Sequence, residues 1–160
     1  MRALLLALAL IGCATPARAQ DQMAPFAPLI GCWRGAFDGQ ASVHDERCFE
    51  PMLGGRYVRD THNVRPTAYG GESIYFFDPG ARSLAYAYYA ADGAISSGRV
   101  HTEEGALVFE PGEYVGADGA RMRLRARWSF DGADRYVAVT EREENGVWLP
   151  LMRISYERVR

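Results

Sequence analysis

The chain has 160 residues, of which 48% are hydrophobic, and this is enough to form one domain around one core. All 18 basic residues are arginine, and 20 acidic residues outnumber them, so the net charge is −2. This balance argues against nucleic acid as a partner, because neutralising its phosphates requires a strongly basic face.

Residues 1–19 have the pattern of a signal peptide. Arg2 precedes an apolar run of ten residues, and Ala17-Arg18-Ala19 has the form of a cleavage site. We therefore expect a periplasmic or secreted mature domain over residues 20–160. It keeps 16 arginines against 20 acidic residues, for a net charge of −4.

A second interpretation of the N-terminus remains open. Leu10-Ile11-Gly12-Cys13 resembles a lipobox, in which case Cys13 would be lipidated and the protein would be an outer-membrane lipoprotein. The apolar run is too short to span a bilayer as a helix, and no other stretch of the sequence is a candidate span.

Beyond a short proline-containing segment, turn residues divide the chain into ten β-type runs. None has the period of about 3.6 residues that marks an amphipathic helix, and strands spaced by roughly 8–12 residues indicate an all-β sandwich or barrel. Asp-Gly and Asn-Gly pairs between the runs supply the positive φ angles of tight hairpins. We expect a single antiparallel up-and-down β-barrel of about ten strands. The predicted strands are residues 30–37, 43–50, 56–64, 72–78, 83–90, 95–102, 106–114, 120–130, 135–142 and 147–158.

The mature chain keeps two cysteines, Cys32 and Cys48. If the first two strands form a hairpin around Asp38-Gly39-Gln40, the two cysteines lie roughly opposite each other, which predicts a disulfide in an exported protein. Two free buried thiols are the alternative. A metal site is not expected, because the cysteines lack a C-x-x-C spacing.

The fourth and fifth predicted strands carry aromatic residues that could line the barrel interior. Tyr86 and Tyr88 alternate with small residues, and Tyr75 and Phe77 lie on the neighbouring strand. Barrels of this size either fill with side chains or hold one small ligand, and both possibilities remain open here.

Polar residues alternate along two further strands. One face combines Arg56 with Val58, Asp60 and His62, and another combines Ile95 with Ser97, Arg99 and His101. If these faces point inward they form a buried network or an anion-binding site, and if they point outward they are solvated. We expect Arg99 and His101 to supply the polar contacts of a pocket walled by the aromatic residues.

The eighth predicted strand has the clearest alternation. Its apolar face faces inward, and the arginines at positions 121, 123, 125 and 127 face water. A solvated outer face is the simpler interpretation of this row, and a docking site for an acidic partner is the alternative.

Several short motifs resemble a known family. Their order and spacing are similar to those of uncharacterised bacterial lipocalin-like proteins of the calycin superfamily, over roughly residues 28–158. The motifs are Gly31-x-Trp33, Leu53-Gly54-Gly55-Arg56-Tyr57, Tyr75-Phe76-Phe77-Asp78, Gly112-Glu113-Tyr114 and residues 152–158. The resemblance implies a calycin-like barrel with no established enzymatic activity. It also implies that Gly31 and Trp33 lie at the closed end of the barrel, with Arg158 stacked on the indole.

The expected function is the binding of a small apolar or amphiphilic molecule in the barrel, without a cofactor. One alternative is a haem-binding barrel like nitrobindin, for which only His44, His62 and His101 could supply an axial ligand. Another is a structural or interaction module of the envelope. An enzyme is less favoured, because the sequence has neither a G-x-S-x-G nor an H-E-x-x-H motif.

Overall fold

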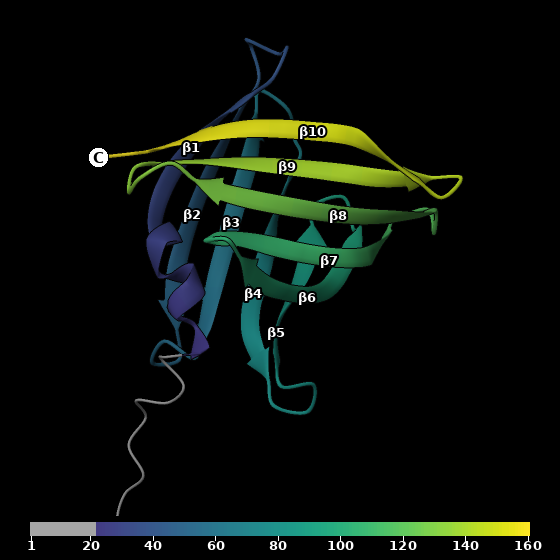
Figure 1. The fold of residues 1–160 in the computed structure, drawn as a ribbon. Coiled ribbons are helices and arrows are strands. Elements are labelled where there is room, and N and C mark those ends of the chain that lie inside the picture. The colour runs from purple at the N-terminus through teal and green to yellow at the C-terminus, as the bar shows by residue number, and fades with distance from the viewer. Residues whose placement is uncertain (1–21) are drawn as a thin grey trace, which may run out of the picture.

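The computed structural model describes residues 22–160, which form one closed antiparallel barrel of ten strands (Figure 1). Each strand pairs with the next along the chain, and β10 pairs with β1 to close the barrel. The elements are η1 (Ala24–Leu29), β1 (Gly31–Phe37), β2 (His44–Met52), β3 (Tyr57–Arg65), β4 (Gly70–Asp78), β5 (Ser83–Ala90), β6 (Ile95–Glu103), β7 (Ala106–Val115), β8 (Arg121–Phe130), β9 (Arg135–Glu144) and β10 (Val147–Arg158).

The predicted fold class and strand count are confirmed. Every predicted run corresponds to one strand, and no end differs by more than two residues. Strand β7 is continuous through Pro111-Gly112, where its register with β6 and β8 shifts. The expected signal peptide and lipobox lie outside the described residues. Within residues 22–160, no helix has both the length and the apolar character needed to cross a bilayer.

The inside and outside of the barrel follow the two-residue alternation of the strands. On β8, Trp128 is buried while the arginines between the apolar positions face outward. Each of these arginines pairs with a glutamate of another strand, on β6, β7 or β9. The pairs are Arg121–Glu113, Arg123–Glu143, Arg125–Glu141 and Arg127–Glu103.

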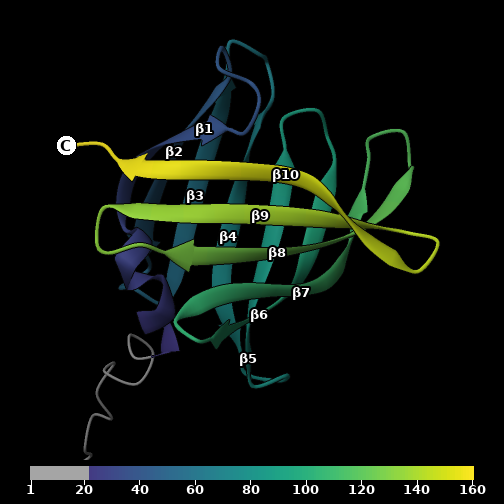
Figure 2. The ribbon, with the colours of Figure 1, turned by 45° about the horizontal axis from the view of Figure 1, so that its top comes forward.

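The 3-10 helix η1 closes one end of the barrel, opposite the β9–β10 hairpin (Figures 1 and 2). Phe26 and Leu29 are fully buried there, and the Phe26 ring stacks on Tyr75 with centroids 4.5 Å apart. The indole Nε1 of Trp33 donates a hydrogen bond to the Leu29 carbonyl at 2.7 Å. Aromatic packing therefore fills this end of the barrel.

Arg158 locks the same end. Its guanidinium lies 4.1 Å from the centroid of the Trp33 ring, and it donates hydrogen bonds of 2.7 Å to the carbonyls of Ile30 and Pro28. It also donates to the Ala133 carbonyl in the β8–β9 turn. One side chain thus joins η1, β1 and a distant turn, and supplies the stacking that the family resemblance implies.

Gly31 is required at this point of the chain. Its φ of +116° is disfavoured for residues with a side chain, and a Cβ there would lie 3.0 Å from the Nη1 of Arg158. The Gly-x-Trp motif therefore combines a backbone conformation with space for the arginine that covers the tryptophan.

The predicted disulfide between Cys32 and Cys48 is confirmed. The two residues are direct cross-strand partners on β1 and β2, with Cα atoms 4.1 Å apart. Because Trp33 points inward next to Cys32, the disulfide lies on the outer side of the barrel.

We expect Trp33→Ala to lower the free energy of unfolding by about 3–5 kcal/mol through the lost core volume. Arg158→Ala should lower it by about 2–3 kcal/mol, because hydrogen bonds are lost together with the stacking. A double-mutant cycle in urea should give a coupling energy of about 1 kcal/mol. Strictly additive effects would contradict an energetic contact between the two side chains.

Candidate functional site

A cavity of about 310 Å³ lies inside the barrel, above the packed end and toward the β3–β4 loop. Most of its wall is aromatic or aliphatic, and the rim includes the partly exposed Tyr69 and Met152. The apolar wall consists of Phe37, Val64, Tyr69, Tyr75, Tyr86, Tyr88, Phe109, Tyr114, Leu124, Ala126, Trp128, Ala138, Met152, Ile154 and Tyr156. Such a wall with a few polar groups is typical of a small-molecule site.

Glycines on neighbouring strands position two of the wall tyrosines. Tyr86 lies opposite Gly98, where a Cβ would come within 3.0 Å of the ring. A Cβ at Gly71 would lie 2.5 Å from the Tyr88 ring, which is too close for any other residue. The rings therefore lie flat against neighbouring backbone, and this leaves the centre of the barrel open.

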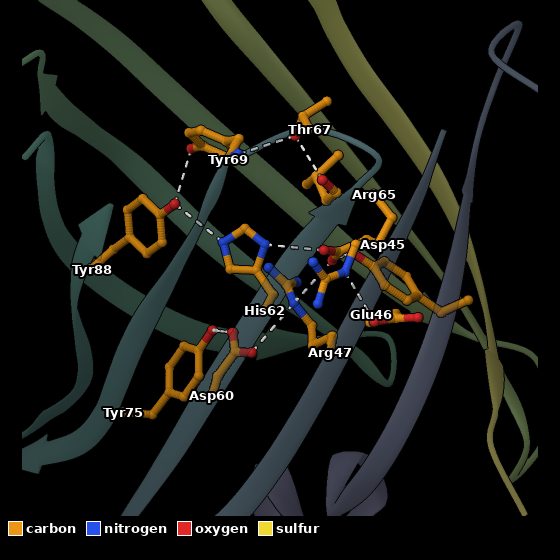
Figure 3. Close-up of polar contacts among 12 residues, drawn as sticks. Asp45, Glu46, Arg47, Asp60, His62, Arg65, Thr67, Tyr69, Tyr75 and Tyr88 are labelled. Atoms are coloured by element: carbon orange, nitrogen blue, oxygen red, sulfur yellow. Dashed lines mark hydrogen bonds and ion pairs between the residues drawn. The ribbon is translucent and has the colours of Figure 1, made fainter. Parts of the chain in front are cut away.

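Charged side chains from β2 and β3 meet at the inner end of the cavity (Figure 3). Asp45 and Arg47 share the inward face of β2, and Asp60 and His62 share that of β3. The Nε of Arg47 lies 3.3 Å from an Asp60 oxygen and 3.5 Å from an Asp45 oxygen. Both carboxylates are essentially inaccessible to solvent, so their pairing with Arg47 offsets a large desolvation cost.

The guanidinium of Arg47 is held between aromatic rings. It lies 5.3 Å from the centroid of Trp128, 5.5 Å from Tyr156 and 5.9 Å from Phe49. The side chain is 12% exposed, and it forms part of the cavity wall. Within residues 22–160 its Nε makes no hydrogen bond of good geometry, and the side chain contributes to the cavity wall.

A chain of hydrogen bonds runs from this cluster to the rim. His62 contacts Asp45 through Nδ1 at 3.1 Å and Tyr88 through Nε2 at 3.1 Å. The Tyr88 hydroxyl in turn donates to the Tyr69 hydroxyl at 2.9 Å. Tyr156 donates to the second Asp45 oxygen at 2.6 Å, which fixes the carboxylate in place. Figure 3 shows dashed lines that lead from Asp45 through His62 and Tyr88 to Tyr69.

The two aspartates differ in their electrostatic environment. Burial raises the pKa of Asp45, but the hydrogen bond with His62 and the charge of Arg47 outweigh burial, so its pKa lies below the ordinary 3.8. Burial also raises the pKa of Asp60, and there the charge of Arg47 offsets it only in part, so its pKa lies above 3.8. Asp45 is therefore the firmly ionised partner of Arg47.

The structure places three of the predicted pocket residues at the cavity and three elsewhere. Tyr75, Tyr86 and Tyr88 belong to the wall, whereas Phe77, Arg99 and His101 do not. Tyr75 is also the floor on which Phe26 stacks.

The inward placement of Arg99 and His101 was wrong because β6 points its other face into the barrel. Ser96 and the buried Val100 face inward, so Arg99 and His101 are exposed and both lie near Glu110, at 3.0 and 3.5 Å. Phe77 follows the inward face of β4 past Tyr75, toward the β4–β5 turn, and so lies beyond the inner end of the cavity.

Of the two orientations left open for the face with Asp60 and His62, the structure has the inward one, but the arginine of the cluster comes from β2. Asp60 and His62 are buried, and Arg47 completes the cluster instead of Arg56. A signal in the sequence could have located Arg47. If Trp33 faces inward, Cys32 faces outward, and its disulfide partner Cys48 must do the same, which places residue 47 inside.

Among the residues that the structure describes, His62 is the histidine that lines the cavity. Both ring nitrogens of His62 already have partners, Asp45 and Tyr88, so haem ligation would require Nε2 to leave the tyrosine. His44 lies outside the wall beside Arg34 and Glu46. In the part of the chain that the structure describes, no three His, Cys, Asp or Glu side chains form a metal-binding group.

Asp45→Asn and Asp60→Asn should change stability with opposite dependence on pH. The lowered pKa of Asp45 means that its carboxylate stabilises the fold above pH 3.8, and that this contribution is lost as the pH falls through the lowered value. Asp45→Asn should therefore cost about 3 kcal/mol near neutral pH and less in acid.

The raised pKa of Asp60 makes its contribution to stability depend on pH in the opposite direction. Its contribution is full below pH 3.8 and declines as the pH rises through the raised value, so the advantage of wild type over Asp60→Asn should shrink with rising pH. Urea unfolding of both variants across this range measures the two slopes. Parallel slopes would contradict the assignment of the ionised partner to Asp45.

Comparison with solved structures supports the fold. The chain is similar to Rv2717c from M. tuberculosis, with a TM-score of 0.59 and 14% sequence identity over 91% of this chain and 99% of that chain. At this identity the similarity shows a common barrel fold alone. No protein-family model and no curated protein matches the sequence. The calycin resemblance therefore rests on the short motifs, and what is shown is a ten-stranded antiparallel barrel with a structural neighbour in Rv2717c.

Proposed function

We propose that the protein binds a small, largely apolar molecule inside the barrel. The observation that carries this proposal is the cavity of about 310 Å³, with its aromatic wall and its polar inner end. At roughly 30 Å³ for each water in the liquid, this volume corresponds to about ten waters, which sets the scale of the ligand. A wall built so largely of rings favours an apolar body, and the inner cluster favours one polar end.

The wall is held in place without a ligand. Tyr88 is tied to His62 and Tyr69, and Tyr86 lies within 3.3 Å of the Ser96 hydroxyl. A wall whose rings are already fixed loses little side-chain entropy on binding, and this supports a preformed site.

The other expected functions have weaker support. A structural module of the envelope needs no cavity, and a haem barrel needs a histidine nitrogen that is free to face the iron. An absorption spectrum of the purified protein tests the haem alternative directly, since a Soret band would favour it.

We also propose that the protein is exported. The signal-like sequence of residues 1–19 supports this location, and the Cys32–Cys48 disulfide is consistent with an oxidising compartment. Intact-mass measurement of the secreted form should place its N-terminus at Gln20. A diacylated Cys13 would instead establish the lipoprotein alternative.

Filling the cavity should abolish binding without unfolding the barrel. Ala126 lines the cavity on β8, and Ala126→Phe places a ring in the space that we assign to the ligand. We expect the affinity for N-phenylnaphthylamine, an uncharged fluorescent probe, to fall by at least about tenfold.

Ala87→Phe is the matched control, because Ala87 alternates with the wall residues Tyr86 and Tyr88 and so lies on the outer face of β5. It should leave probe binding unchanged. Equal binding by wild type and Ala126→Phe, with both proteins folded by circular dichroism, would contradict a site in this cavity.

A further inference from the structure

We propose that Arg47 recognises an uncharged hydrogen-bond acceptor on the ligand, such as the carbonyl of a ketone, ester or amide, and discriminates against a carboxylate. This inference rests on the proposed function, since it requires the cavity to hold a ligand. It assigns to Arg47 the polar contact that the sequence had placed at Arg99.

The first argument is the unused donor capacity of Arg47. A guanidinium has five N–H donors and no acceptor. Its ion pairs with Asp45 and Asp60 are both measured from Nε, and Nε itself lacks a hydrogen bond of good geometry within residues 22–160. The rings of Trp128 and Tyr156 flank the guanidinium, and the hydroxyl of the buried Tyr136 is a further partner. These partners use fewer N–H groups than the five that the guanidinium carries. The remaining N–H groups of Arg47 therefore lie at the inner end of an apolar cavity without an acceptor from residues 22–160, and a ligand that supplies one would gain a hydrogen bond.

The second argument is the total charge around those donors. With both aspartates ionised, Arg47 leaves the cluster at −1 if His62 is neutral and at 0 if His62 is protonated. Protonation of the more deeply buried Asp60, with His62 neutral, also gives 0. In these three states the positive charge of Arg47 is already matched, so an entering anion meets no net attraction, and a surplus of +1 arises only when Asp60 and His62 are protonated together.

The other ionisable groups at the cavity do not change this sum. Burial raises the pKa of Tyr75, Tyr88, Tyr136 and Tyr156, so these phenols stay neutral. Arg125 faces outward on β8 but also borders the cavity, and its Nε is paired with Glu141 at 2.6 Å.

The two arguments together select the ligand chemistry. The N–H groups of Arg47 can donate hydrogen bonds, but the cluster around them has no surplus positive charge. An uncharged acceptor such as a carbonyl gains the hydrogen bond without bringing an unpaired charge into the interior. A carboxylate would gain the same hydrogen bonds but would add a negative charge beside two aspartates. The apolar wall does not distinguish between the two, so the discrimination depends on the Arg47 cluster.

Heptyl methyl ketone and octanoate provide a matched pair of probes. They share a heptyl chain and have the same number of non-hydrogen atoms, and they differ in charge at the polar end. The third probe is the alkene in which a CH₂ group replaces the ketone oxygen. Displacement of N-phenylnaphthylamine from the full-length mature protein near neutral pH gives the three affinities.

We expect the ketone to bind about tenfold more tightly than both the alkene and octanoate, as a hydrogen bond from a charged donor implies. Equal binding of ketone and alkene, or tighter binding of octanoate, would overturn the inference while leaving the proposed function intact. If the fluorescent probe itself does not bind, the proposed function fails instead.

Two variants test the role of the cluster. Arg47→Lys keeps the charge but loses the planar fork, and should remove most of the preference for ketone over alkene. Asp45→Asn raises the charge sum by one and should improve octanoate relative to ketone by about tenfold. An unchanged ratio in Asp45→Asn would overturn the charge argument. Urea unfolding verifies that each variant is folded in the assay.

Arg99→Ala is the matched control, because Arg99 is exposed on the outside of β6 and pairs with Glu110. It removes an arginine of the same charge without altering the cavity. A change in the ketone preference in this variant would count against the assignment to Arg47.

Discussion

The interior of this barrel depends on the burial of one guanidinium. Two carboxylates and three aromatic rings surround Arg47 and offset the cost of removing it from water. Asp45 comes from the same strand as Arg47, while Asp60 comes from the next strand of the hairpin. The charged cluster is therefore local in sequence, whereas two of the three rings, Trp128 and Tyr156, come from β8 and β10.

The same cluster divides the barrel into a filled part and a hollow part. On the side of the cluster toward η1, the buried side chains of Phe26, Leu29 and Trp33 fill the barrel interior. On the other side of the cluster, the tyrosines lie flat against glycine-containing backbone and leave the centre open. The charged cluster lies at the boundary between the two parts. The cavity therefore has an apolar wall and hydrogen-bonding groups at its inner end, which would orient a ligand.

The barrel could be predicted from the sequence because turn residues mark every hairpin. Asn145-Gly146 and its equivalents impose positive φ angles, which fix where each strand ends. The site was harder to predict, because alternation shows which residues share a face but not which face is inside. On β3 the polar face is inside, and on β6 the face with Arg99 is outside, although both patterns look alike in the sequence. For β2 alone, the disulfide indicates which face of the strand points into the barrel.

The order of the strands has a consequence for how the barrel is completed. Nine of its ten strand pairings join neighbours in the chain, whereas the pairing of β1 with β10 brings together segments such as Ile30 and Arg158, 128 residues apart. Loop-closure entropy therefore makes this seam the most demanding contact to form during folding. Until it forms, β1 and β10 are both open edges, available for pairing with another chain. The arginine that covers Trp33 thus also helps to keep the folded barrel from self-association, because it fastens the seam that removes both edges at once.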